Sequence, residues 1–140
     1  MRTIFFVIIT GALFTLFYGC ATVHDYEPKS QDEVEIKAFL VDMETKWKNI
    51  DKPGYLSLMS DDAKIMMGGD RKIISKAEYA KLLPDRMKEI GPMKFGTPEI
   101  NVTGNTAIVN LSLSVRNRTR PFTLNLLRIQ DRWMLQSSSY

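Results

Sequence analysis

The chain is poor in the residues that most often carry cross-links or chemistry. Cysteine occurs once, at Cys20, so no disulfide can form within the chain and stability must come from packing. Histidine also occurs once, at His24. The sequence contains no glycine-rich phosphate loop, metal-ligand cluster or nucleophile motif, and its net charge of +3 is too mild to indicate nucleic-acid binding. We therefore expect no metal, no cofactor and no nucleic-acid partner.

Long hydrophobic runs are absent except at the start of the chain. Arg2 is followed by a nearly unbroken apolar run over residues 4–18. The run is shorter than the about 20 residues of a membrane-spanning helix, but it suits the apolar core of a secretory signal. Gly19 and Cys20 then match the last two positions of the lipid-attachment site of bacterial lipoproteins. The aromatic pair before them, Phe17 and Tyr18, does not fit the first two positions of that site. The pattern predicts a signal peptide over residues 1–19 and lipid attachment at Cys20.

Acyl chains on Cys20 would tether the protein to a membrane, since stable anchoring takes more than one lipid chain. In Gram-negative bacteria an aspartate after the lipidated cysteine is linked with inner-membrane retention, and here that residue is Ala21. We therefore expect a lipid-anchored protein of the bacterial cell envelope, at the outer membrane and facing the periplasm. The alternatives are an ordinary signal peptide cut nearby and an uncleaved anchor, which also place the chain outside the cytoplasm.

The rest of the chain is long enough for one domain with a real core. Residues 20–29 are polar, and we interpret them as a short tether in which His24 is solvated. Residues 30–140 form the domain. Two capping boxes, which begin at Ser30 and Ser75, predict helices, and Pro53 starts a shorter helix between them.

The second half of the domain changes from helical spacing to alternation. Between residues 107 and 115 apolar and polar residues alternate strictly, which is typical of a half-buried strand. Asp61 and Asp62 are assigned to a turn before the first strand. The predicted strands cover residues 64–67, 72–74, 95–102, 107–115, 122–130 and 133–139. Helices followed by an antiparallel meander indicate an α+β domain.

Two stretches and the element order resemble a known superfamily. The first stretch, residues 54–65, reads Gly-Tyr-Leu-Ser-Leu-Met-Ser-Asp-Asp-Ala-Lys-Ile, and the second, residues 126–135, ends in Trp-Met-Leu. Both are similar to passages of the nuclear transport factor two-like superfamily, whose members are also called SnoaL-like or cystatin-like. The resemblance implies a cone-shaped, curved antiparallel sheet that wraps about three N-terminal helices, and a homodimer formed through the outer face of the sheet.

The superfamily includes a ketosteroid isomerase that needs a carboxylate base and two proton donors. Aligned through Asp61-Asp62-Ala63, the base position falls on Met67 and the tyrosine donor falls on Met43. The second donor falls on Asn125, which can donate a hydrogen bond but cannot act as an acid. The resemblance therefore does not extend to that reaction.

The cone of the superfamily implies a cavity that could hold an apolar molecule. Our candidate lining residues are Met43, Trp47, Tyr55, Met67, Tyr79, Asn125 and Leu127. Arg116, Arg118 and Arg120 alternate along a predicted strand end, so they can share one side and contact an anion. For each set there is a simpler interpretation, namely core packing for the first and a solvated hairpin tip for the second.

Three functions remain open. We expect a non-catalytic envelope lipoprotein whose cone binds a small hydrophobic ligand or a protein partner. The first alternative is an enzyme of the isomerase or hydratase type, for which Tyr55 and Tyr79 are the ionisable candidates. The second is a structural adaptor that dimerises through its sheet.

Overall fold

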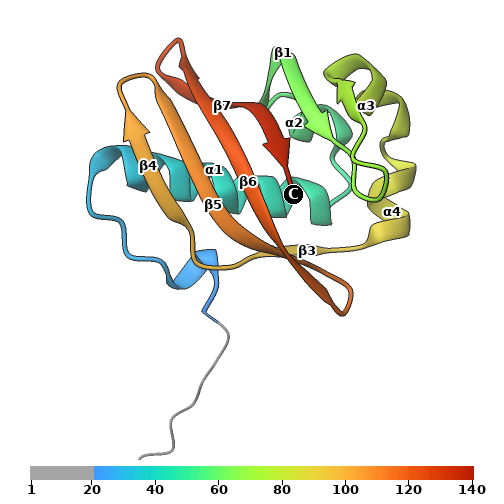
Figure 1. Ribbon diagram of the computed structural model, residues 1–140, viewed down its shortest axis with the longest axis horizontal. Helices are drawn as coiled ribbons and strands as arrows, with labels where there is room; N and C mark the ends of the chain where they lie inside the picture. Colours follow the sequence, from blue (N-terminus) through green and yellow to red (C-terminus); the bar gives the residue numbers. More distant parts are fainter. Residues whose placement is uncertain (1–20) are drawn as a thin grey trace, which may run out of the picture.

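The computed structural model describes residues 21–140, which fold as a curved seven-stranded sheet with its helices on one face (Figure 1). The predicted signal peptide and Cys20 lie outside the described residues. The helical elements are η1 (Val23–Asp25), α1 (Gln31–Lys48), α2 (Lys52–Leu56), α3 (Lys76–Leu82) and α4 (Asp85–Ile90). The strands are β1 (Met59–Met66), β2 (Ile73–Ser75), β3 (Met93–Phe95), β4 (Glu99–Thr103), β5 (Thr106–Val115), β6 (Arg118–Ile129) and β7 (Arg132–Ser139).

The sheet runs in the order β2-β1-β7-β6-β5-β3, and β4 also pairs with β5. All pairs are antiparallel except β1 and β7, which run parallel. The predicted α+β cone is confirmed. The sheet is mixed and not purely antiparallel, because the last strand, β7, lies parallel to the first strand, β1. Pro98 and its neighbours divide the predicted strand over residues 95–102 into β3 and β4.

Both capping boxes mark helix starts, as predicted. At α3, Ser75 accepts from the backbone N–H of Glu78, and the Glu78 carboxylate accepts from the backbone N–H of Ser75. At α1, Ser30 caps the N–H of Glu33, but the Glu33 carboxylate accepts from Tyr26 and Lys29 instead. These bonds satisfy backbone donors that a helix start leaves free.

Strand β1 begins earlier than the sequence pattern suggests. It runs from Met59, so Asp61 and Asp62 lie in a strand and not in the predicted turn. Both aspartates are exposed, while Ala63 and Ile65 are buried. The pairing of Met59 with Leu135 of β7 extends the strand, and a register shift between Met59 and Lys64 accommodates the polar residues. A long-range pairing of this kind leaves no trace in local sequence.

The core lies between α1 and the concave face of the sheet. Ile36 and Leu40 of α1 are completely buried, as are Val109 of β5 and Leu124 of β6. Along β5 and β6 the buried residues alternate with less buried ones, so one face of each strand packs on the helix and the other faces outward.

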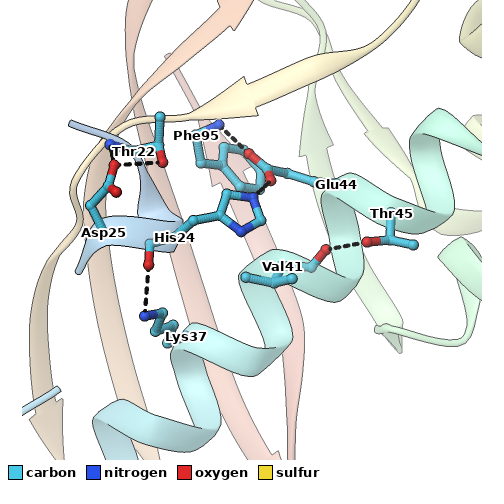
Figure 2. Close-up of polar contacts among 8 residues, drawn as sticks. All are labelled: Thr22, His24, Asp25, Lys37, Val41, Glu44, Thr45 and Phe95. Carbon is cyan, nitrogen blue, oxygen red and sulfur yellow. Dashed lines mark hydrogen bonds and ion pairs between the residues drawn. The ribbon is translucent and has the colours of Figure 1, made fainter. Parts of the chain in front are cut away.

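The segment from Thr22 to Tyr26 packs on the domain, whereas we expected a free tether. Thr22 forms a bridge with Gly96 after β3, and Val23 is completely buried. His24 is not an isolated solvated side chain, because its Nε2 lies 2.8 Å from Glu44 Oε2 of α1 (Figure 2). Val23 is a single apolar residue among mostly polar neighbours, so the local sequence shows no periodicity from which this packing could be predicted.

Glu44 joins the N-terminal segment to the sheet. Its carboxylate is buried, and its second oxygen accepts from the backbone N–H of Phe95, at 2.5 Å from that nitrogen (Figure 2). A buried carboxylate is costly unless it is hydrogen-bonded. The two contacts satisfy Glu44 and hold η1, α1 and β3 together.

Candidate functional site

Five of the predicted pocket residues meet inside the cone. Met43 and Trp47 come from α1, Tyr55 from α2, Met67 from the loop that follows β1 and Tyr79 from α3. The ring centroids of Trp47 and Tyr55 are 5.2 Å apart, and those of Tyr55 and Tyr79 are 6.5 Å apart. The space between these side chains is only about 60 Å³. That volume is far below the roughly 300 Å³ of a small ligand pocket, so these residues mainly pack the cone.

Asn125 and Leu127 do not line the cone, contrary to our prediction. Their neighbours Leu124 and Leu126 are buried, and Asn125 and Leu127 point to the outer face of the sheet. There Asn125 donates to Ser137 Oγ at 2.9 Å. Successive residues of a strand face opposite ways, so a prediction displaced by one residue selects the wrong face.

Tyr55 and Tyr79 are the only ionisable groups of the predicted pocket. Burial raises the pKa of Tyr79 to about 12, and burial also raises the pKa of Tyr55 well above its ordinary value. Both phenols therefore stay protonated near neutral pH and cannot act as bases there.

A larger cavity opens at one end of the cone, and we call it the cone mouth. It measures about 580 Å³ and is open to solvent. Its residues come from the β1–β2 loop, α4, the β5–β6 hairpin and the C-terminus. They are Gly68, Gly69, Arg86, Glu89, Ile90, Leu113, Val115, Arg116, Asn117, Arg118, Arg120 and Tyr140. In Figure 1 the hairpin tip and α4 lie at the right-hand side of the molecule.

The cone mouth is the wide entrance to the packed interior. Arg86, Ile90, Leu113, Val115 and Tyr140 line both the mouth and the narrow space behind it. The centroid of the Tyr140 ring lies 5.1 Å from that of Phe122, which lines the narrow space alone. The mouth has the volume of a ligand site, which commonly lies between about 300 and 1,000 Å³.

Arg116, Arg118 and Arg120 all line the mouth, Arg118 and Arg120 from β6 and Arg116 from the turn before it. Arg118 pairs with Val115 and Arg120 pairs with Leu113 across the hairpin. Residues directly opposite in an antiparallel pair share a face, so both arginines stand on the concave side. Arg116 donates to the backbone carbonyl of Glu89 and so joins the hairpin to α4.

Three features of the mouth escaped the sequence analysis. Arg86, Glu89 and Tyr140 are not among the residues that the sequence predicted for the site. The one sequence feature that could have drawn attention to Arg86 is its position two residues after Pro84, at the start of α4. The distance of α4 from the β5–β6 hairpin in sequence hides their proximity.

The structure shows neither a membrane-spanning helix nor a metal site in residues 21–140. No helix of that region is long and apolar enough to cross a bilayer. No group of three or more metal-ligating side chains gathers within it.

The comparisons with known proteins identify the fold. Neither a protein-family model nor a curated protein matches the chain, but many solved structures do. One is a protein of unknown function with a cystatin-like fold from Nostoc punctiforme, with a TM-score of 0.67 and 18% identity over 80% of this chain and 91% of that one. Another, from Shewanella oneidensis, is nuclear transport factor two-like, with a TM-score of 0.63 and 24% identity over 76% of this chain and 96% of that one.

A third, also nuclear transport factor two-like and from Cytophaga hutchinsonii, has a TM-score of 0.68 and 14% identity over 79% of this chain and 96% of that one. The chain therefore has the cone fold of the nuclear transport factor two-like proteins. That fold hosts many functions, so it does not define an activity by itself.

Proposed function

We propose that this protein is an exported lipoprotein of the bacterial envelope whose cone domain binds a small apolar molecule at the cone mouth without catalysis. The observation that supports it is the 580 Å³ cavity with an apolar wall of Ile90, Leu113, Val115 and Tyr140. The phenols of the packed interior behind the mouth, Tyr55 and Tyr79, are held protonated at neutral pH. The packed interior therefore offers no phenolate base, and we propose that the mouth acts by binding alone.

The lipid anchor follows from the sequence pattern at Cys20 and adds a geometric consequence. Only Ala21 separates Cys20 from Thr22, which is already paired with Gly96. Two residues span at most about 7 Å, so an acylated Cys20 would hold the domain directly at the outer-membrane surface. Labelling with radioactive palmitate tests the anchor, with loss of label expected for Cys20→Ser.

Ligand binding is tested on the protein purified from its own envelope. Small molecules extracted from it are identified by mass spectrometry, and the same is done for Val115→Trp, which fills the mouth. Ser114→Trp is the matched control, because Ser114 is the neighbouring residue and points to the outer face. We expect an apolar compound from the wild type and from the control, and its loss from Val115→Trp. Equal recovery from all three proteins would contradict the proposal.

A second candidate function, dimerisation as an adaptor, is favoured by the outer face of the sheet. The centre of that face carries no charged side chain in β5, β6 and β7: it presents Ile108, Asn110, Thr123, Asn125, Leu127 and Met134. Ile108 is 48% exposed. Depletion of charge is typical of the core of a protein interface. We propose a homodimer through this face, and we expect Ile108→Lys to convert it to a monomer in light-scattering measurements.

A further inference from the structure

The charges at the cone mouth are unbalanced within the described chain. Four guanidinium groups line the mouth, those of Arg86, Arg116, Arg118 and Arg120, against the one carboxylate side chain of Glu89. None of the four forms an ion pair with a carboxylate in residues 21–140. Their only polar side-chain contact in that region is the bond from Arg116 to the backbone of Glu89.

The arrangement brings cations from two separate elements to one cavity. Arg86 belongs to α4, while Arg118 and Arg120 stand on the concave side of the β5–β6 hairpin. Like charges that line one cavity repel one another. A guanidinium presents donors in a planar fork that matches a carboxylate or a phosphate.

The same cavity also has an apolar side. Leu113 and Val115 of β5 lie next to the arginines that pair with them, and Ile90 and Tyr140 complete the wall. The interior behind this wall is nearly filled, with about 60 Å³ of free space. A long chain cannot thread into the cone, so the apolar part of a ligand must be short or must lie along the mouth.

We infer that the cone mouth binds an amphipathic anion. Its carboxylate or phosphate is held by Arg118 and Arg120 with support from Arg86, and its apolar part lies on Val115, Leu113 and Tyr140. This inference rests on the proposed function and names the chemical class of its ligand. The anion comes either from a lipid headgroup at the membrane surface or from a free amphiphile.

The test uses the full chain in phosphatidylcholine nanodiscs and two probes observed by fluorine NMR, trifluorohexanoate and trifluorohexanol. Empty nanodiscs correct for partition into lipid. We expect the acid to bind at least about tenfold more tightly than the alcohol, because hydrogen bonds between two charged groups are roughly twice as strong as those between neutral ones. Salt at about 1 M should reduce this preference for the acid, since the Debye length is then about 3 Å.

The variant Arg118→Gln/Arg120→Gln should weaken acid binding about tenfold and leave alcohol binding within about twofold. The matched control Lys64→Gln/Arg132→Gln removes two exposed positive charges outside the mouth and should change neither. If the double variant fails to fold, the single variant Arg118→Gln carries the same test. Equal binding of acid and alcohol, unaffected by the variants, would overturn this inference and leave the proposed function standing.

Failure of both probes to bind would overturn the inference together with the proposed function. When binding occurs, added phosphatidylglycerol separates the two sources of the anion. Competition by this lipid with the acid indicates a headgroup, and undiminished binding of the acid indicates a free amphiphile.

Discussion

Arginine is used in opposite ways at the two ends of the cone. At the end where α1 begins, Arg128 of β6 contacts Asp32, lies 3.0 Å from Glu35 Oε2 and covers the ring of Trp133 with its guanidinium carbon 4.5 Å from the centroid. Its hydrogen bond to Asp32 holds the pKa of Arg128 above its ordinary value. At the cone mouth, four arginines have no carboxylate partner in the described chain.

This difference distinguishes an arginine whose ion pairs stabilise the fold from arginines that form no such pairs. The pairing of Arg128 links the N-terminus of α1 to β6, which are far apart in sequence. The mouth arginines make no comparable link, apart from Arg116, so the stability of the domain does not account for them. Arg128 is paired with carboxylates at one end, and the mouth arginines are not paired with carboxylates of the described chain at the other. The predictions below run from the packed body of the cone to the mouth, and the last of them tests that contrast.

The largest effect is expected for a deletion in the packed body of the cone. Leu126 is 1% exposed and faces the core, whereas Leu127 faces outward. Leu126→Ala should lower the free energy of unfolding by about 2–5 kcal/mol. Leu127→Ala should cost less than half as much, because a half-exposed side chain loses less contact. Urea unfolding measures both, and equal losses would contradict the assignment of the two faces.

The second-largest effect is expected at alkaline pH, which should lower the free energy of unfolding through the packed interior. The pKa of Tyr79 is about 12 in the folded protein against 10.0 ordinarily. The unfolded chain therefore loses this proton first, and stability is full below pH 10 and falls as the pH rises to about 12. The loss from this group at pH 12 is roughly 2 kcal/mol. Tyr79→Phe should show a shallower decline between these pH values, and an identical decline would refute the role of Tyr79.

Removal of the buried carboxylate that holds the N-terminal segment should have a somewhat smaller effect. Glu44→Ala leaves the buried N–H of Phe95 without its partner and frees His24. An unsatisfied buried donor costs about 1–3 kcal/mol. Glu27→Ala is the control, since Glu27 makes no hydrogen bond or ion pair to the rest of residues 21–140. A loss below about 0.5 kcal/mol for Glu44→Ala would show that the segment is not held by this contact.

The smallest effect on stability is expected at the cone mouth. Arg120→Gln should change the free energy of unfolding by no more than about 0.5 kcal/mol, as for surface positions without specific contacts. Arg128→Gln should lower the thermal midpoint measurably, because it removes two ion pairs and the contact with Trp133. If Arg120→Gln destabilised the protein as much as Arg128→Gln, the mouth arginines would be structural and the contrast between the two ends would disappear.

Local patterns predicted much of the fold. Capping boxes at Ser30 and Ser75 marked the helix starts, and the alternation over residues 107–115 marked β5. The order of these elements indicated an α+β domain, and the resemblance to the superfamily implied the cone. Local patterns failed where distant contacts decide the structure, as in the parallel pairing that extends β1 to Met59 and the packing of Val23.

The candidate site was predictable only in part. Alternation along a strand is a local signal, and it placed Arg118 and Arg120 on one side of β6, whereas Arg116 lies in the β5–β6 turn. Arg86 and Tyr140 were missed because only the folded chain brings α4 and the C-terminus to the same cavity. Asn125 was misplaced because a strand position that differs by one residue faces the other way.

A crystal structure of the protein isolated from its own envelope tests the central claim most directly. We predict an ordered molecule in the cone mouth, with a carboxylate or phosphate within hydrogen-bond distance of Arg118 or Arg120 and an apolar portion against Val115. A mouth that contains only water, with the same arginines turned toward carboxylates of the protein, would contradict the account.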